Sequence, residues 1–331
     1  MYSGEQNDSA AIIKPLNAQP KQINERAMTS PSLHHVSCPD SGNGHRMAYW
    51  QWGQPHSRHV VLCVHGLSRQ GRDFDVLARA LCDSAGHAGM RVICPDVVGR
   101  GESDWLPDPK GYQLPTYAAD MLALLANLHA QTPMTTLDWV GTSMGGLIGM
   151  AVCGQPNLPL PVAVNKLVLN DVGPTLEWQA LMRIGAYLGK AGQFTSVQEA
   201  ADAMWAISSG FGPHTPEQWL ALSRPMFRPV SSAADSKLRL HYDPVIAVPF
   251  GLATEASTLE GEAMLWQLYD HITAHTLLLR GAQSDLLTAK TASAMTQRGP
   301  RARLIEFAGV GHAPTLIASD QVAVVVDFLS V

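Results

Sequence analysis

The chain has 331 residues, of which 46% are hydrophobic and 15% charged, a balance typical of a globular enzyme with one large core or one core plus an inserted lid. Its 23 basic and 28 acidic residues give a net charge of -5 without a basic stripe, so the composition argues against a nucleic-acid partner. Five scattered cysteines without metal-like spacing favour a reducing compartment, here the cytoplasm, and no apolar run approaches the roughly 20 residues that a membrane span needs.

Residues 1–32 differ from the rest of the chain, because they are rich in Ser, Asn, Gln, Ala and Pro and contain a single short apolar run at residues 10–13. A secretory signal needs a basic start followed by an apolar stretch of roughly 7–15 residues, and this segment has neither. We therefore predict a disordered N-terminal extension, and Met28 is an alternative start of the protein.

Strand-like and helix-like segments alternate along most of the remaining chain. Two antiparallel strands come first, followed by short apolar runs that fit strands covered on both faces. Strands are predicted at residues 34–38, 47–53, 59–65, 90–95, 137–140, 165–169, 276–279 and 302–307, and helices at 74–85, 116–130, 147–153 and 318–329. This alternation predicts an α/β fold, a mostly parallel central sheet with helices on both faces.

The alternation breaks at residues 175–274, where helix signals follow one another without strands. These helices are predicted at residues 177–188, 197–207, 216–222 and 259–272. About a hundred residues is too long for a loop, so we predict a helical cap inserted into a core of residues 33–174 and 275–331. The cap is rich in Met, Trp and Leu, which are expected to pack it onto the core and to line part of an apolar substrate pocket.

Ser143 lies in a Gly-x-Ser-x-Gly pattern formed with Gly141 and Gly145, between a short apolar strand and an apolar helix. Strand, tight turn and helix is the context that this motif needs, because the turn projects the serine Oγ above the end of a sheet. The glycines avoid crowding against neighbouring backbone. The pattern predicts a nucleophile elbow with Ser143 as nucleophile.

A serine hydroxyl needs a base, and the base needs a carboxylate to orient it. His312 fits the base, because it follows the last predicted strand in a loop of small residues. Two carboxylates are candidates for the third member: Asp285, beyond the penultimate strand, and Asp171, beyond the strand before it. Asp285 is the preferred choice, since its loop lies beside the one that carries His312, and Asp171 has the alternative role of capping a loop or supporting the cap hinge.

An oxyanion hole needs two N–H groups aimed at the developing charge. Met144 follows the nucleophile and supplies one of them. The loop after the strand that ends at His65-Gly66 should supply the other, which makes Leu67 the second predicted donor.

These motifs together resemble the α/β-hydrolase superfamily over nearly all the chain beyond the extension. The resemblance rests on His65-Gly66, residues 96–104 with the pattern Asp-x-x-Gly-x-Gly-x-Ser-Asp, residues 141–146, residues 281–285 and Gly311-His312. It implies a lid inserted between the sixth and seventh strands, the chain order Ser, acid, His, and no cofactor. Haloalkane dehalogenases and epoxide hydrolases of this superfamily carry Asp at the position of Ser143, so both are disfavoured.

Arg69 and Arg72 lie beside the predicted oxyanion loop. A guanidinium group binds carboxylates through two parallel hydrogen bonds, so both arginines are candidates for a substrate-binding role. The alternative is an ion pair with a nearby acid such as Asp73 or Asp75 that holds the loop. Residues 67–74 also resemble a segment of bacterial hydrolases associated with hydroxyalkanoate esters or oligomers.

The resulting prediction is a serine esterase that cleaves a small-to-medium carboxylic ester through an acyl-enzyme, without metal or cofactor. Three alternatives stay open. The first is hydrolysis of a C–C bond in a meta-cleavage-type diketo acid by the same triad, with a requirement for Arg69 or Arg72. The others are a non-catalytic small-molecule binding protein and acyl transfer to an alcohol instead of water.

Overall fold

The computed structural model describes residues 30–39, 42, 44–85, 89–190, 192–232 and 236–330. The predicted disordered extension therefore lies almost entirely outside the described residues, as does Met28. Among the helices of the described segments, none combines the length and apolar character that crossing a bilayer requires.

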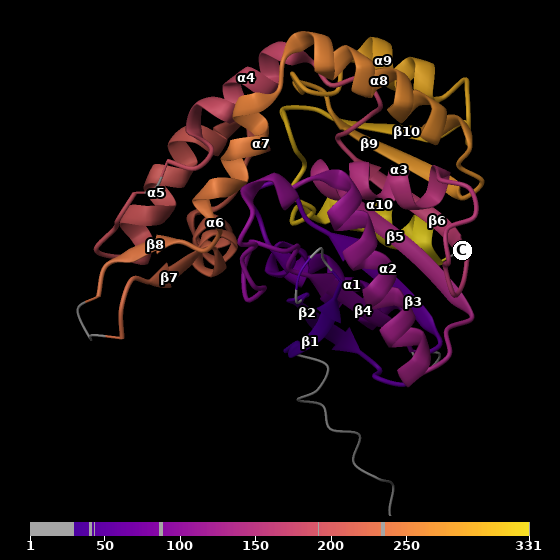
Figure 1. Ribbon diagram of the computed structural model, residues 1–331, viewed down its shortest axis with the longest axis horizontal. Helices are drawn as coiled ribbons and strands as arrows, with labels where there is room; N and C mark the ends of the chain where they lie inside the picture. Colours follow the sequence, from indigo (N-terminus) through magenta and orange to yellow (C-terminus); the bar gives the residue numbers. More distant parts are fainter. Residues whose placement is uncertain are drawn as a thin grey trace, which may run out of the picture.

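An eight-stranded sheet forms the centre of the protein (Figure 1). Its order is β1(Ser32–Cys38), β2(His45–Gly53), β4(Arg91–Pro95), β3(His59–Val64), β5(Thr136–Thr142), β6(Val164–Asn170), β9(His275–Gly281) and β10(Arg303–Phe307). The pairs β1–β2 and β2–β4 are antiparallel and all the others are parallel. The predicted fold class is confirmed. In the parallel part the carboxyl ends of neighbouring strands meet at one edge, where loops from distant parts of the chain come together.

Helices cover both faces of this sheet, which is why its central strands are continuous apolar runs. On one face, α1(Asp75–Ser84) and α10(Ser319–Ser330) pack against alternate strand residues such as Cys63. On the other, α2(Leu114–Gln131) and α3(Met144–Gly154) pack against the intervening residues such as Leu62. The two hydrophobic layers fix the height and orientation of the strand ends.

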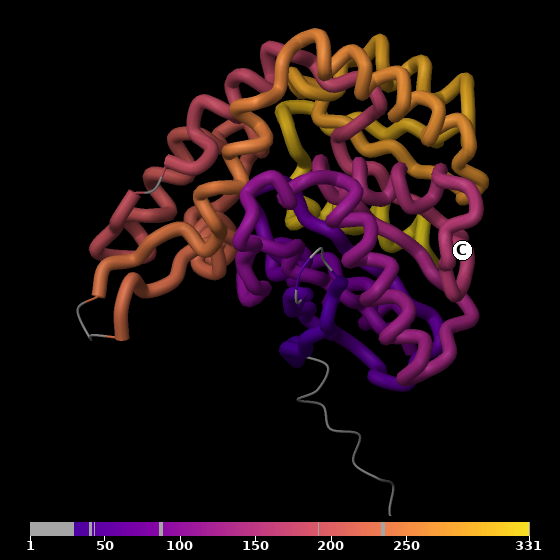
Figure 2. The backbone as a smooth tube through the Cα atoms, viewed as in Figure 1, coloured from indigo at the N-terminus to yellow at the C-terminus, as the bar shows by residue number. Residues whose placement is uncertain are grey.

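Between β6 and β9 the chain leaves the sheet and forms most of its remaining helices. These are α4(Trp178–Tyr187), α5(Val197–Ser208), α6(Pro216–Ser223), α7(Ala247–Leu252) and α8(Glu255–Asp270), with a small hairpin of β7(Phe227–Pro229) and β8(Leu238–Leu240) that the helix signals did not predict. In the backbone tube, α4 and α5 lie beside the later run through α6 and α7 (Figure 2).

Helix α8 connects this insertion back to the core. It packs against α3, where a Cβ on Gly154 would lie only 2.0 Å from the carbonyl oxygen of Leu268. The missing side chain at Gly154 lets the two backbones approach this closely. The end of the insertion is therefore anchored on the core, and the domain bounds 33–174, 175–274 and 275–331 stay a prediction.

Candidate active site

The turn between β5 and α3 holds Ser143 in a strained conformation. Its φ is 51° and its ψ is -115°, values that residues with a side chain rarely adopt. A Cβ on Gly145 would lie 1.9 Å from the Val64 carbonyl oxygen, and one on Gly141 would lie 2.3 Å from the Gly145 carbonyl oxygen. Both positions require glycine, so the geometry has the form predicted for a nucleophile elbow.

His312 lies within hydrogen-bonding distance of this serine. Its Nε2 is 2.9 Å from Ser143 Oγ. Asn170 steadies the loop of His312, because its Nδ2 donates to the Pro314 carbonyl oxygen at 2.8 Å. The structure thus brings the predicted nucleophile and the predicted base together, although 169 positions separate them in the chain.

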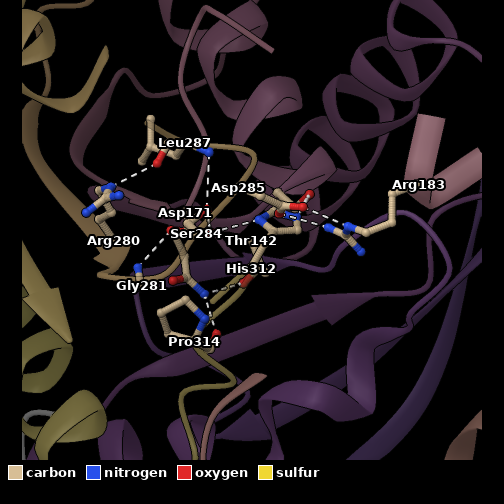
Figure 3. Close-up of polar contacts among 12 residues, drawn as sticks. Thr142, Asp171, Arg183, Arg280, Gly281, Ser284, Asp285, Leu287, His312 and Pro314 are labelled. Atoms are coloured by element: carbon tan, nitrogen blue, oxygen red, sulfur yellow. Dashed lines mark hydrogen bonds and ion pairs between the residues drawn. The ribbon is translucent and has the colours of Figure 1, made fainter. Parts of the chain in front are cut away.

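The carboxylate that faces His312 is Asp171, the alternative considered above. Asp171 Oδ2 accepts a hydrogen bond from His312 Nδ1 at 2.8 Å (Figure 3). Asp171 is fully buried, and it also accepts from the Gly281 N–H at 2.8 Å and from Ser284 Oγ at 2.7 Å. These donors give hydrogen-bond partners to carboxylate oxygens that water does not reach.

The preferred assignment of Asp285 as the partner of His312 is therefore wrong in this geometry. Asp285 accepts two hydrogen bonds from Arg183, on α4, from Nε at 2.7 Å and from Nη2 at 2.8 Å (Figure 3). Asp171 directly follows β6 and turns through a positive φ of 57°, which carries its side chain under His312. Asp285 lies four residues beyond β9 and binds Arg183 of the insertion instead.

The Asp285–Arg183 pair is half exposed, with 47% and 44% of the two side chains accessible to solvent. Burial works against ionisation of Asp285, but the hydrogen bonds and charge of Arg183 prevail and lower the pKa of Asp285 below its usual value. The hydrogen bonds from Asp285 raise the pKa of Arg183 in turn. Both groups are charged at neutral pH.

The predicted oxyanion donors, the N–H groups of Leu67 and Met144, flank Ser143. Met144 is the first residue of α3, and Leu67 follows Gly66, whose added Cβ would lie 3.7 Å from the Ser143 Cβ. The N-terminus of a helix presents N–H groups and a positive dipole end to a developing negative charge. The role of these two N–H groups as oxyanion donors stays a prediction.

Two buried residues that the sequence analysis did not assign hold the Leu67 loop. His65 Nδ1 lies 2.7 Å from the Gly66 carbonyl oxygen, which belongs to the same peptide unit as the Leu67 N–H, and His65 Nε2 accepts from the Val97 N–H at 2.9 Å. Burial lowers the pKa of His65 to about 3, so the ring is neutral. Arg100 Nε donates to the Leu67 carbonyl oxygen at 2.8 Å. The signal for His65 was a polar residue at the end of an otherwise apolar strand.

Two cavities meet at Ser143. We call the first the polar chamber; it has a volume of about 400 Å³ and is lined by residues that include Ser143, His312, Arg69, Arg183, Asp285 and Phe211. We call the second the apolar chamber; it has a volume of about 200 Å³ and is lined by residues that include Ser143, Met144, Leu147, Val172, Leu181 and Phe250. Ser143 therefore lines two cavities of different chemical character.

The two arginines singled out from the sequence are both engaged in ion pairs. Arg69 donates from Nε and Nη2 to Asp73 at 2.6 and 2.8 Å, and it lines the polar chamber although it is 9% exposed. Arg72 pairs with Asp75 and lies over the Trp50 ring, 4.7 Å from its centroid. This arrangement matches the loop-holding alternative more closely than a substrate-binding role.

One buried group of metal-ligand type, Cys38, His45 and Asp120, occurs among the described residues. It lies at the antiparallel edge of the sheet, on β1, β2 and α2, and not beside Ser143. His45 Nε2 and Asp120 Oδ2 are 3.0 Å apart, a hydrogen-bonding distance. These residues belong to the packing of β1 and β2 on α2 and do not contribute to the two chambers.

Comparison with known proteins connects this geometry to a family. The model of the alpha/beta hydrolase family matches residues 61–328. A 3-hydroxybutyrate-oligomer hydrolase of Cupriavidus necator is 46% identical over 301 residues, which cover 91% of this chain and 98% of the relative.

Solved structures show the same relationship. An alpha/beta hydrolase from Novosphingobium aromaticivorans superimposes with a TM-score of 0.74 at 32% identity, covering 92% of this chain and 99% of its own. A Rickettsia typhi protein superimposes with a TM-score of 0.75 at 25% identity, covering 91% of this chain and 99% of its own.

Proposed function

Since the chain belongs to the alpha/beta hydrolase family, we propose that it is a serine hydrolase that cleaves carboxylic esters through an acyl-enzyme, with Ser143, His312 and Asp171 as its triad. The observation that carries the proposal is the continuous line of contacts from Ser143 Oγ to His312 Nε2 at 2.9 Å and from His312 Nδ1 to Asp171 Oδ2 at 2.8 Å.

In the first half of the reaction, Ser143 Oγ attacks the ester carbonyl carbon while His312 Nε2 takes its proton. Asp171 stabilises the imidazolium that forms. The N–H groups of Leu67 and Met144 donate to the oxyanion. The tetrahedral intermediate collapses, His312 returns its proton to the leaving alkoxide, and an alcohol departs from the acylated serine.

In the second half, a water molecule attacks the acyl-enzyme. His312 takes a proton from the water, and the same two N–H groups stabilise the second oxyanion. Collapse transfers the proton from His312 to Ser143 Oγ and releases the carboxylic acid. This cycle uses residues of the chain and water, and it needs no metal or cofactor.

Short oligomers of 3-hydroxybutyrate are the proposed substrates. The relative at 46% identity is named for that activity, and its similarity extends over almost its whole length. An oligomer of this kind is a chain of small esters with methyl branches, which fits two chambers of about 400 and 200 Å³ that are both lined by Ser143.

The alternative of C–C bond hydrolysis depends on Arg69 or Arg72 gripping a substrate carboxylate. Arg69 is only 9% exposed and pairs with Asp73, and Arg72 pairs with Asp75 and is not among the residues that line the polar chamber, so ester hydrolysis is better supported. The triad geometry likewise favours an enzyme over a non-catalytic binding protein.

A reducing compartment is part of the proposal. All five cysteines are free thiols, and four of them are buried in the core. Burial raises the pKa of Cys82 to about 12, which leaves this thiol protonated and unreactive at neutral pH. The cysteines therefore pack as small hydrophobic side chains, in keeping with a cytoplasmic enzyme.

Labelling with a fluorophosphonate probe, followed by peptide mapping, tests the nucleophile. We expect a single adduct on Ser143 and none in Ser143→Ala, while Ser209→Ala, which changes another serine of the polar chamber, still gives the adduct. His312→Ala should also prevent labelling. An adduct elsewhere, or none in a folded protein, would refute the proposed mechanism.

A further inference from the structure

The two chambers differ in whether they contain the general acid. His312 lines the polar chamber, whereas the residues that line the apolar chamber include Ser143 and Met144 but not His312. During acylation, His312 must pass its proton to the oxygen of the departing alcohol, which therefore lies on the His312 side of the serine. The alcohol part of the ester accordingly extends into the polar chamber and the acyl part into the apolar one.

A linear oligomer of a hydroxy acid has a fixed direction. Each ester bond joins the carbonyl carbon of one unit to the hydroxyl oxygen of the next, so the free carboxylate always lies on the alcohol side of the bond that is cleaved. An oligomer bound at Ser143 in the productive direction therefore carries its negative charge into the polar chamber.

Arg183 is the accessible cation of that chamber. Its side chain is 44% exposed, whereas Arg69, the other arginine of the lining, is 9% exposed and held by Asp73. Asp285 takes the Nε and Nη2 donors of Arg183 and leaves Nη1 outside this contact. Arg183 also belongs to α4, in the insertion, so it reaches the polar chamber from a different part of the chain than Ser143.

We propose that Arg183 binds the terminal carboxylate of the oligomer and thereby orients it with its alcohol side toward His312. This inference rests on the proposed ester hydrolysis. Asp285 has a positioning role: it fixes the guanidinium plane at the chamber wall through two parallel hydrogen bonds. Asp285, which was predicted to be the acid of the triad, instead holds an arginine that determines specificity.

The ion pair between Arg183 and Asp285 leaves room for a second anion. A guanidinium group has five N–H donors in a plane, and a carboxylate engages two of them. Tyr187 also hydrogen-bonds to Arg183, and the donors that remain can donate to a second carboxylate at the edge not taken by Asp285. Because the pair is half exposed and the net charge of its two members is zero, the attraction is moderate and acts over a short range.

The test compares two substrates that differ in charge alone: the linear dimer of 3-hydroxybutyrate as its free acid and as its terminal carboxamide. We expect the wild-type protein to prefer the acid, and Arg183→Gln to lose about tenfold in kcat/KM for the acid relative to the carboxamide, mainly through KM. Arg298→Gln is the matched control, because the Arg298 side chain is 46% exposed, close to the 44% of Arg183, pairs with Asp270 and does not line the chamber. Its acid-to-carboxamide ratio should stay at the wild-type value.

The outcomes separate this inference from the proposed function. Turnover of both dimers with an acid-to-carboxamide ratio that Arg183→Gln leaves unchanged would overturn the role of Arg183 and keep ester hydrolysis. Failure of the wild-type protein to hydrolyse either dimer, while it still hydrolyses p-nitrophenyl butyrate, would overturn the inference and the substrate together. Failure on all three esters would overturn the proposed function itself. Far-UV circular dichroism and a thermal transition establish that each variant is folded.

Discussion

The ionisable groups on the floor of this site and those on its rim differ in burial and in hydrogen bonding. On the floor, at the strand ends, Asp171 and His65 are fully buried; Asp171 accepts three hydrogen bonds and His65 makes two. On the rim, Asp285 and Arg183 are half exposed and bind each other. The difference separates two tasks, because buried and fully bonded groups can fix reacting atoms, while exposed pairs can exchange partners with a charged substrate.

Substitution of the two aspartates should give the largest difference between the floor and the rim. Asp171→Asn should lower kcat for p-nitrophenyl butyrate by about 10³–10⁴-fold, since an amide cannot stabilise the imidazolium of His312. Asp285→Asn removes a rim contact and should lower it by less than about tenfold. Both variants need a wild-type circular dichroism spectrum.

The opposite ranking of these variants would return Asp285 to the triad. Wild-type kcat in both would mean that neither carboxylate assists His312, and the floor would then have only a structural role. Steady-state kinetics on a neutral ester keeps the charge preference of Arg183 out of this measurement.

His65 tests whether the floor depends on a neutral, buried ring. Its pKa is about 3 in the folded protein and 6.5 without burial, so the unfolded chain binds a proton that the folded protein does not bind between these values. Stability should therefore fall as the pH is lowered through this window.

The measurement compares urea unfolding of the wild type with that of His65→Gln, which has no titrating group at this position. From pH 8 to pH 5 the wild type should lose about 2 kcal/mol more unfolding free energy than the variant. Asp96, whose pKa burial raises to about 7, is common to both proteins and drops out of the difference. An equal loss of unfolding free energy in both proteins would show that His65 is protonated in the folded protein at pH 5, as it is in the unfolded chain.

Ser284 supports Asp171 on the floor of the site. Its Oγ donates to Asp171 at 2.7 Å and accepts from the Leu287 N–H at 3.1 Å. Ser284→Ala should lower kcat by about tenfold with little change in KM, because it removes one hydrogen bond to a buried carboxylate. Ser284→Thr keeps the hydroxyl and should restore most of the loss. A rise in KM without a fall in kcat would mean that Ser284 shapes the chamber and does not support Asp171.

Local patterns predicted the sheet, the Ser143 turn and the position of His312, because apolar runs and glycine spacing act within a few residues. The choice between Asp171 and Asp285 could not be made this way. Both follow strands that lie side by side in the sheet, and the outcome depends on a positive φ at Asp171 and on Arg183, which is 102 positions from Asp285.

Residues whose partners come from other elements were missed for the same reason. Arg183 is one arginine on an insertion helix, and nothing in its neighbourhood along the chain marks it as part of the site. Arg100 lies in a motif that was recognised, yet its bond to the Leu67 carbonyl oxygen spans 33 positions. Their assignment depends on tertiary contacts that no local pattern encodes.

Salt gives the mildest test of the rim. Charges that are half exposed are screened by mobile ions, whereas buried contacts are much less affected. Raising NaCl from about 0.05 to 0.5 M should lower the acid-to-carboxamide ratio of kcat/KM by roughly two- to threefold, since the screening length falls to a few ångströms. The value for the carboxamide alone should change little and serves as the internal control. A ratio that does not respond to salt would point to a buried cation such as Arg69 and would remove the distinction between rim and floor on which the role of Arg183 depends.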